Sequence, residues 1–227
     1  MAIPTPAILL SQTKSNYGQK LGPEAEEYLS ALFKAVCDGW KSWQDTIKFG
    51  GFTVSGGGVG AWSGSGVNGT MTGDGYSMPS FSFKANSPQQ VKFTNGLASA
   101  LAQKFTAFPA SYKIPSVIFT GASGATPVSP GPVNGQMTPS PMTTGVGTNP
   151  SGVADAWKAV LTPPDFDLGK PQCKSADLVK AISKAIETAF KTTWLATTMM
   201  SANTLSTAGA PGGAVVGAMS PFDGKLV

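Results

Sequence analysis

The sequence predicts an α+β fold in which three helices pack on short β-strands and long glycine-rich loops join them. Three observations predict it. Three long segments carry apolar residues at steps of three and four, which is the helical period. A short apolar segment with β character follows each of them, and a stretch rich in Gly, Ser and Pro comes next. Because this order occurs three times, the chain is predicted to consist of three helix–strand–loop repeats.

The first predicted helix begins at Pro23, and three glutamates lie in its first turn, where carboxylates face the positive end of the helix dipole. Apolar residues from Leu29 to Ile47 recur at helical spacing, and the glycines at Gly50–Gly51 end the helix. The segment Phe52–Val54 then has the composition of a strand.

The second predicted helix begins with the capping-box sequence Ser87–Gln90 and ends at Pro109, because proline disrupts the interior of a helix. Val117–Thr120 follows it with β character, and Phe81–Phe83 is a further candidate strand. The third long helix is predicted to begin at Ser175.

A short helix is predicted as an insertion at Gly152–Leu161, before the third long helix. Each long helix carries a large aromatic residue near its end, and aromatic residues on an apolar helix face usually pack in the core. We therefore expect Trp40, Phe108 and Trp194 to be buried.

A hexapeptide of the pattern V-x-G-x-M-[ST] begins at Val67, at Val133 and, in a weaker copy, at Val215. Each copy follows a glycine-rich stretch, so the three copies are expected to occupy equivalent positions. The organisation that this predicts, within one compact domain, is an N-terminal arm at 1–21, repeat unit 1 at 22–80, repeat unit 2 at 81–147, and the inserted short helix plus repeat unit 3 at 148–227.

The predicted loops are poor in charge, since only Asp74 and four lysines are charged between residues 49 and 154. Such a surface is suited to being covered by neighbouring subunits, and ordering the backbone of a residue costs about 1–2 kcal/mol. We therefore expect Ser55–Gly75 and Ala122–Gly147 to be mobile in an isolated protomer and ordered in an assembly, against either neighbours or an external ligand. The candidate subunit-interface residues are Trp62, Val67, Asn68, Gly69, Met71, Val128, Val133, Asn134, Gly135, Met137, Val215, Gly217 and Met219.

Two absences from the composition, His and Arg, argue against catalysis. Histidine is the usual general base and a common metal ligand, and arginine is the residue that best grips phosphate. Gly64–Gly69 matches G-x-G-x-x-G, but the acidic residue that a dinucleotide site needs about 20 residues later is missing. Asp165 and Asp167 offer too few oxygens for Ca²⁺. We therefore predict no enzyme activity, no catalytic residues, no cofactor and no metal.

The charge pattern and the N-terminal residues indicate which classes of partner to expect. The net charge is +4, and the sixteen basic residues are scattered lysines, so no sequence-specific nucleic-acid partner is expected. The N-terminal residues do not fit a signal peptide and no stretch is long enough for a spanning helix, so we expect no membrane partner. Cys37 is expected to be buried in the first helix, and whether it pairs with Cys173 stays open.

These features together indicate a structural subunit that packs against copies of itself and against other structural proteins of one particle. The low charge and the Gly/Thr-rich loops resemble the general character of minor virion proteins, such as capsid, neck, tail or baseplate components of a bacteriophage or of a contractile injection particle. The expected location is a virion or assembled particle that is built in the host or producer cytoplasm. The alternative is a secreted or surface-displayed, adhesin-like binding module. An enzyme that uses Lys or Asp as its base is a third class, and no residue cluster nominates a site for it.

Overall fold

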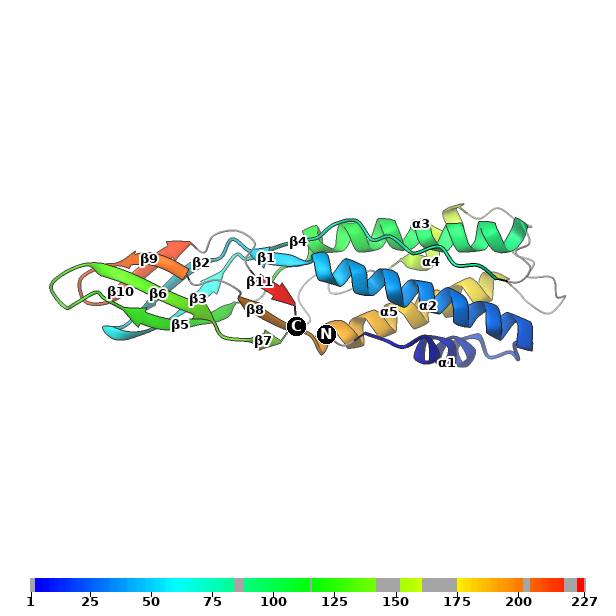
Figure 1. The fold of residues 1–227 in the computed structure, drawn as a ribbon, viewed down its shortest axis with the longest axis horizontal. Coiled ribbons are helices and arrows are strands. Elements are labelled where there is room, and N and C mark those ends of the chain that lie inside the picture. The colour runs from blue at the N-terminus through cyan, green and yellow to red at the C-terminus, as the bar shows by residue number, and fades with distance from the viewer. Residues whose placement is uncertain are drawn as a thin grey trace.

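The computed structural model describes residues 3–83, 88–114, 116–141, 152–160, 175–201, 205–218 and 224–226. The molecule is elongated, with the helices together in one half and a β-barrel at the opposite end (Figure 1). A second sheet lies between these two halves. Helices and antiparallel sheets are both present, which confirms the α+β class.

The helical half contains three long helices and two shorter ones among the described residues. Each long helix buries one side, as its apolar spacing predicts. The helix α1 packs along α5 and α2, and α4 packs on α3 and α5. The bounds of the helices are α1 Pro6–Tyr17, α2 Pro23–Thr46, α3 Pro88–Ser111, α4 Val153–Val160 and α5 Ser175–Leu195.

Aromatic rings fill the centre of the helical half. The indole of Trp43 lies 5.0 Å from the ring of Phe105, and the ring of Phe190 lies 5.5 Å from the indole of Trp194, with which it is stacked. Trp40 contacts both Phe105 and Phe190. The prediction that the aromatic residues near the helix ends are buried is confirmed, because Trp40, Phe108 and Trp194 are all at most 2% exposed.

The strands form two antiparallel arrangements. A six-stranded closed barrel has the order β10-β2-β3-β5-β6-β9, and a five-stranded sheet has the order β4-β1-β11-β8-β7. The barrel strands are β2 Thr53–Gly57, β3 Gly60–Val67, β5 Val117–Ser123, β6 Gly131–Met137, β9 Leu205–Gly209 and β10 Ala214–Ala218. The sheet strands are β1 Lys48–Gly50, β4 Thr70–Thr72, β7 Ser140–Pro141, β8 Thr198–Ser201 and β11 Gly224–Leu226.

The barrel consists of three consecutive hairpins, β2–β3, β5–β6 and β9–β10, which follow α2, α3 and α5 respectively. The second strand of each hairpin pairs with the first strand of the next, and β10 closes the ring on β2. Each of these three ladders places a glycine opposite a larger apolar residue. The pairs are Gly64 with Phe119, Gly135 with Leu205, and Gly217 with Val54.

The prediction of long glycine-rich loops is wrong, because the stretches that were assigned to loops form most of β2, β3 and β6 and the end of β5. The predicted strand Val117–Thr120 is confirmed as the first part of β5. The long helices do not lie across a sheet either. Their aromatic side chains contact one another, and the strands continue beyond their ends (Figure 1). The glycines do not prevent pairing here, because closure of the barrel gives every strand two hydrogen-bonded neighbours.

Several local predictions are also corrected. Phe81–Phe83 is extended but pairs with no strand. Pro109 does not end α3 and lies inside its last turn. The N-terminal arm contains a helix that the sequence reading missed, although Thr5 caps α1 by accepting a hydrogen bond from the Ile8 N–H at 3.3 Å. Ser87, the first residue of the predicted capping box, lies outside the described residues.

The predicted end of the first helix at Gly50–Gly51 is wrong, because α2 ends at Thr46 and Lys48–Gly50 forms β1. The other helix predictions agree with the structure. α2 begins at Pro23 and α5 at Ser175, as predicted, although Ser175 has no described side chain. The short inserted helix is α4, Val153–Val160, which lies within the predicted Gly152–Leu161. Cys37 is buried in α2, and Cys173 lies outside the described residues.

Candidate interaction surface

The buried side chains of the barrel strands include Val54, Trp62, Phe119 and Met137, and Trp62 lies among glycines. Trp62 of β3 points inward and is 2% exposed. A Cβ atom added to Gly64 or to Gly135 would lie 2.7 Å from its indole ring, so neither position has room for a side chain. A barrel of about eight strands is just wide enough for side chains to fill it. In this narrower barrel the indole takes the space that several side chains would otherwise share.

Two pairs of glycines also bring neighbouring strands close together. Gly56 is opposite Gly64, and Gly121 is opposite Gly135. A Cβ on Gly121 would overlap the backbone oxygen of Asn134 and the Cα of Gly135. The glycines that made these segments look like loops are therefore required by the packing of the barrel wall.

The outside of the barrel carries no charge. The segments 52–72, 116–141 and 205–218, which include all six strands and their connecting turns, contain no Asp, Glu, Lys or Arg. The exposed positions of β3 and β5 alternate with buried ones and hold small or uncharged side chains, such as Ser63, Thr120 and Ile118. The ion pairs Lys14–Glu26 and Lys34–Asp38 lie in the helical half.

The end of the barrel that lies farthest from the helices is formed by three turns, at 58–59, 124–130 and 210–213. Backbone hydrogen bonds join them. The Gly58 N–H donates to the oxygen of Gly213 at 2.9 Å, and the Gly212 N–H donates to the oxygen of Thr126 at 3.1 Å. We call these three turns the barrel tip. Val59 and Val128 of the tip are 50% and 84% exposed.

Val128 is held in a defined loop. The Oγ of Thr126 accepts hydrogen bonds from the N–H groups of Val128 and Ser129, at 3.4 and 2.9 Å. The N–H of Thr126 in turn donates to the oxygen of Ser129 at 2.9 Å. Pro127 and Pro130 restrict the backbone on either side. The loop therefore presents its valine to solvent in one conformation at little further entropic cost.

The structure divides the predicted interface residues between the core and the surface. Trp62, Met71 and Met137 are buried, and Gly69 and Gly135 pack against the rings of Phe52 and Trp62. Exposed residues are Val67, Asn68, Val128 and Asn134. The backbones of Val133, Val215 and Gly217 lie in β6 and β10, whereas Met219 lies outside the described residues.

Sequence reasoning missed Val59, Ile118 and Thr126. Val59 stands alone between glycines, and Ile118 was counted as part of an apolar strand, of which one face proves to be exposed. A signal was available for Thr126, because the sequence Thr-Pro-Val-Ser-Pro combines a turn-forming hydroxyl with two prolines.

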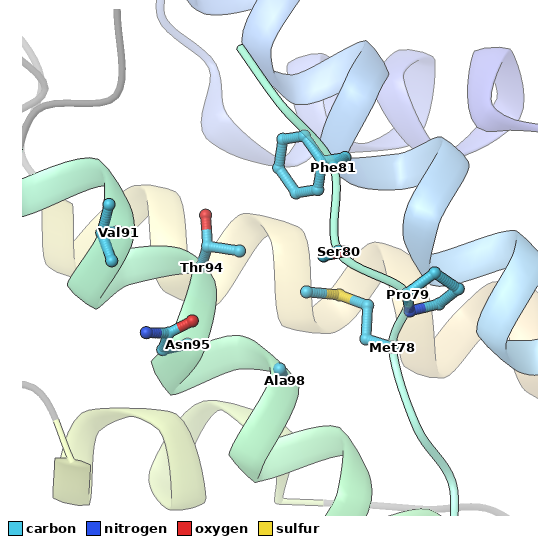
Figure 2. Close-up of a pocket in the computed structure, with 8 residues that line it drawn as sticks. All are labelled: Met78, Pro79, Ser80, Phe81, Val91, Thr94, Asn95 and Ala98. Carbon is cyan, nitrogen blue, oxygen red and sulfur yellow. The ribbon is translucent and has the colours of Figure 1, made fainter.

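A pocket of about 300 Å³ lies in the helical half (Figure 2). One wall is the extended segment Met78–Phe81 and the other is the outer face of α3. Met78 and Phe81 pack partly on the core, and Val91 at the rim is 43% exposed. The lining residues are Met78, Pro79, Ser80, Phe81, Val91, Thr94, Asn95 and Ala98, none of which is charged.

Cys37 carries the one thiol among the described residues. Burial raises the pKa of the Cys37 thiol to about 11, with the charge of Asp38 adding to the shift, so the thiol is a weak nucleophile. Among the described residues no group of three His, Cys, Asp or Glu side chains could hold a metal ion. Within the same part of the chain, no helix has the length and apolar character that crossing a membrane requires.

Comparison of the chain with known protein families, with curated proteins and with solved structures found no match.

Proposed function

We propose that this protein is a structural subunit of a large assembly, a bacteriophage virion or a contractile tail or injection particle, and that the barrel is its main contact with neighbouring subunits. The observation that carries the proposal is the absence of charge from the barrel segments 52–72, 116–141 and 205–218, whereas charged residues occur on the helices and on β1 and β11 of the second sheet. Burying an uncharged surface avoids the desolvation cost that unpaired charges would add.

The shape of the molecule supports the same role. The barrel extends beyond the helices, so that its sides and tip are available to neighbours (Figure 1). The exposed side chains of β3 and β5, such as Ser63, Ile118 and Thr120, are short or apolar, and residues of this kind lose little rotamer entropy when a partner covers them. The helical half has the ordinary charged exterior of a protein that stays in water, including Lys14, Lys34 and Asp38.

We also propose that the fold is built from three related units, each a helix followed by a barrel hairpin. The supporting observation is the ladder register, in which Gly64, Gly135 and Gly217 each pair with an apolar residue of the next hairpin. In this register Val133 and Val215, which begin two copies of the hexapeptide, are equivalent. The position that matches them in the first hairpin is Trp62, so the copy at Val67 is displaced.

The displacement of the first copy is visible directly. Val67 is the last residue of β3 and Met71 lies in β4, with Asn68 in a left-handed turn between them at φ 60°. The second copy lies within β6 except for its last residue. The expectation that all three copies occupy equivalent positions is therefore wrong for the first copy.

The second candidate function is a secreted or surface-displayed binding module. One observation favours it: the barrel tip presents the preorganised Val128 loop at the end of an elongated body, which is a suitable position for contacting an external target. In that case the sides of the barrel would remain in solvent.

Fractionation of the native source separates the two functions. We expect the protein to sediment with particles and to be released only under conditions that dissociate them, with the barrel protected from protease in the particle. Recovery as a free protein in the medium, or display on intact cells, would refute the particle assignment and favour the binding module. The control is a cytoplasmic protein of the same source, which must stay out of the particle fraction.

A further inference from the structure

We propose that copies of this chain associate head to tail, with Val128 at the barrel tip of one copy seated in the pocket between Met78–Phe81 and α3 of the next. This inference rests on the proposed function, because it identifies one partner as a second copy and names the two surfaces. Both surfaces are defined in the structure, and they lie in opposite halves of the molecule (Figures 1 and 2).

The first argument is that Val128 is a rigid apolar projection. Its side chain is 84% exposed, more than any other large hydrophobic residue whose side chain the structure describes. The hydrogen bonds to the Oγ of Thr126 hold the loop, and the bond from the Gly212 N–H to the oxygen of Thr126 fixes the loop to the neighbouring turn. Preorganisation of this kind lowers the entropic cost of binding.

The second argument is that the pocket suits an aliphatic side chain. Its volume of about 300 Å³ is at the lower end of the range for small-molecule sites, roughly 300–1,000 Å³, and is enough for one side chain with its flanking backbone. Met78, Phe81, Val91 and Ala98 supply apolar walls, and Ser80 and Asn95 place polar groups beside them (Figure 2). These polar groups can bond to the backbone of an incoming loop.

The third argument is electrostatic. The chain has a net charge of +4, so identical copies repel one another unless their contact avoids the charged regions. Neither the tip nor the lining of the pocket contains a charged residue. The elongated shape also keeps the charged exterior of one helical half away from that of the next when the tip of one copy meets the helices of another (Figure 1).

A contact between two different surfaces of the same protein is heterologous, and it generates rings or filaments according to whether the rotation between copies closes. An assembly can therefore grow through this one contact, and no third surface of the protein is needed. It also predicts that a substitution at Val128 and a substitution at the pocket each weaken assembly on their own.

The test uses two charge variants at exposed positions, so that the core is left unchanged. Val128→Asp alters the projection and Val91→Asp alters the rim of the pocket. Ile8→Asp, at a 47% exposed isoleucine of α1 that belongs to neither surface, is the matched control. Sedimentation of the purified full chain over a range of concentrations is expected to show assembly for the unaltered protein and for Ile8→Asp, and at least a tenfold weaker association for the other two variants.

Mixing the two defective variants decides between contact geometries. Val128→Asp keeps an intact pocket and Val91→Asp keeps an intact tip, so a head-to-tail contact predicts a mixture that forms dimers and stops there. If the unaltered chain stays monomeric, if Val128→Asp assembles like the unaltered protein, or if the mixture forms no dimer, the head-to-tail contact is refuted. If any of these results is found for a protein that still sediments with particles, only this inference fails and the structural role stands.

Discussion

The barrel interior is narrow enough that single atoms decide which residues fit. Trp62 takes the central space, and Gly64 and Gly135 leave room for its ring. On the adjoining wall Gly121 faces Gly135 across the ladder, where an added methyl group would meet backbone atoms. Backbone atoms cannot rotate away as a side chain can, so the cost of such a methyl group is a shift of the strand.

We therefore expect Gly121→Ala to destabilise the protein by about 3 kcal/mol, the upper end of the usual range for overpacking. Chemical denaturation followed by tryptophan fluorescence measures the change. Gly75→Ala is the matched control, because its added methyl group would only meet the Oγ of Thr106 at an ordinary 3.5 Å, and its effect should stay within about 0.5 kcal/mol. Equal stability of both variants would show that the barrel wall is not as close as described.

Three buried groups, Tyr28, Cys37 and Tyr76, make stability depend on alkaline pH, because burial raises the pKa of each. Burial raises the pKa of Tyr28 from 10.0 to about 12, although its hydrogen bond with Thr94 acts in the opposite direction, and the pKa of Cys37 rises from 9.0 to about 11. The folded chain keeps these protons at pH values where the unfolded chain has lost them. The contribution of Tyr28 and Cys37 to stability is therefore present below about pH 9 and is lost as the pH rises toward 12.

Urea denaturation at increasing pH measures this loss. The unfolding free energy of Cys37→Ala should fall less than that of the unaltered protein between about pH 9 and 11, because the variant lacks the thiol. Identical slopes for the two proteins would contradict the burial of the Cys37 thiol. Reading the difference between the two curves removes the contribution of every group that both proteins share.

Among the elements, the glycine-rich strands behave least like their composition suggests. Gly and Ser rarely favour strands, since they bring no large side chain to pack. The strands β3 and β6 are stabilised by their place in the fold. The closed barrel pairs both edges of each strand, and their glycines leave room for the ring of Trp62. The backbone order that we expected only from neighbouring subunits is therefore available within one chain.

The expectation of mobility in the isolated protomer changes accordingly. We now expect amide hydrogens in the middle of β3 and β5 to exchange slowly in the monomer, because these strands share the longest ladder of the barrel. The exposed turn at 124–130 should exchange faster in the monomer and become protected in the assembly. Hydrogen exchange with mass spectrometry resolves both segments, and fast exchange throughout β3 and β5 would restore the view that these segments need a neighbour.

At the scale of the molecule, the three long helices could be predicted, whereas the N-terminal helix α1 was missed and the barrel could not be predicted. Amphipathic spacing is local, so the starts of α2 and α5 and the burial of Trp40 followed from the sequence alone. Closure of the barrel depends on pairs such as Gly135 with Leu205, which are distant in sequence and have no local signature. Order of elements along the chain was predicted more reliably than the way in which they pair.

The candidate surface was predicted in part for the same reason. Low charge marked the barrel region as unusual, and Val128 within it proved to be the most exposed large hydrophobic residue among the described side chains. Exposure itself depends on which way a strand faces. Without the ladder register, buried residues such as Trp62 and Met137 could not be separated from exposed ones such as Asn134.

The repeated passage of the chain between the two halves has a mechanical consequence. Strands β1 and β4 flank the first hairpin, β7 follows the second, and β8 and β11 flank the third. A force applied at the tip is therefore shared by several covalent connections, and no single linker bears it. A subunit that must transmit tension along its length without extending would benefit from this design, whereas a barrel attached by one flexible tether would yield first at the tether.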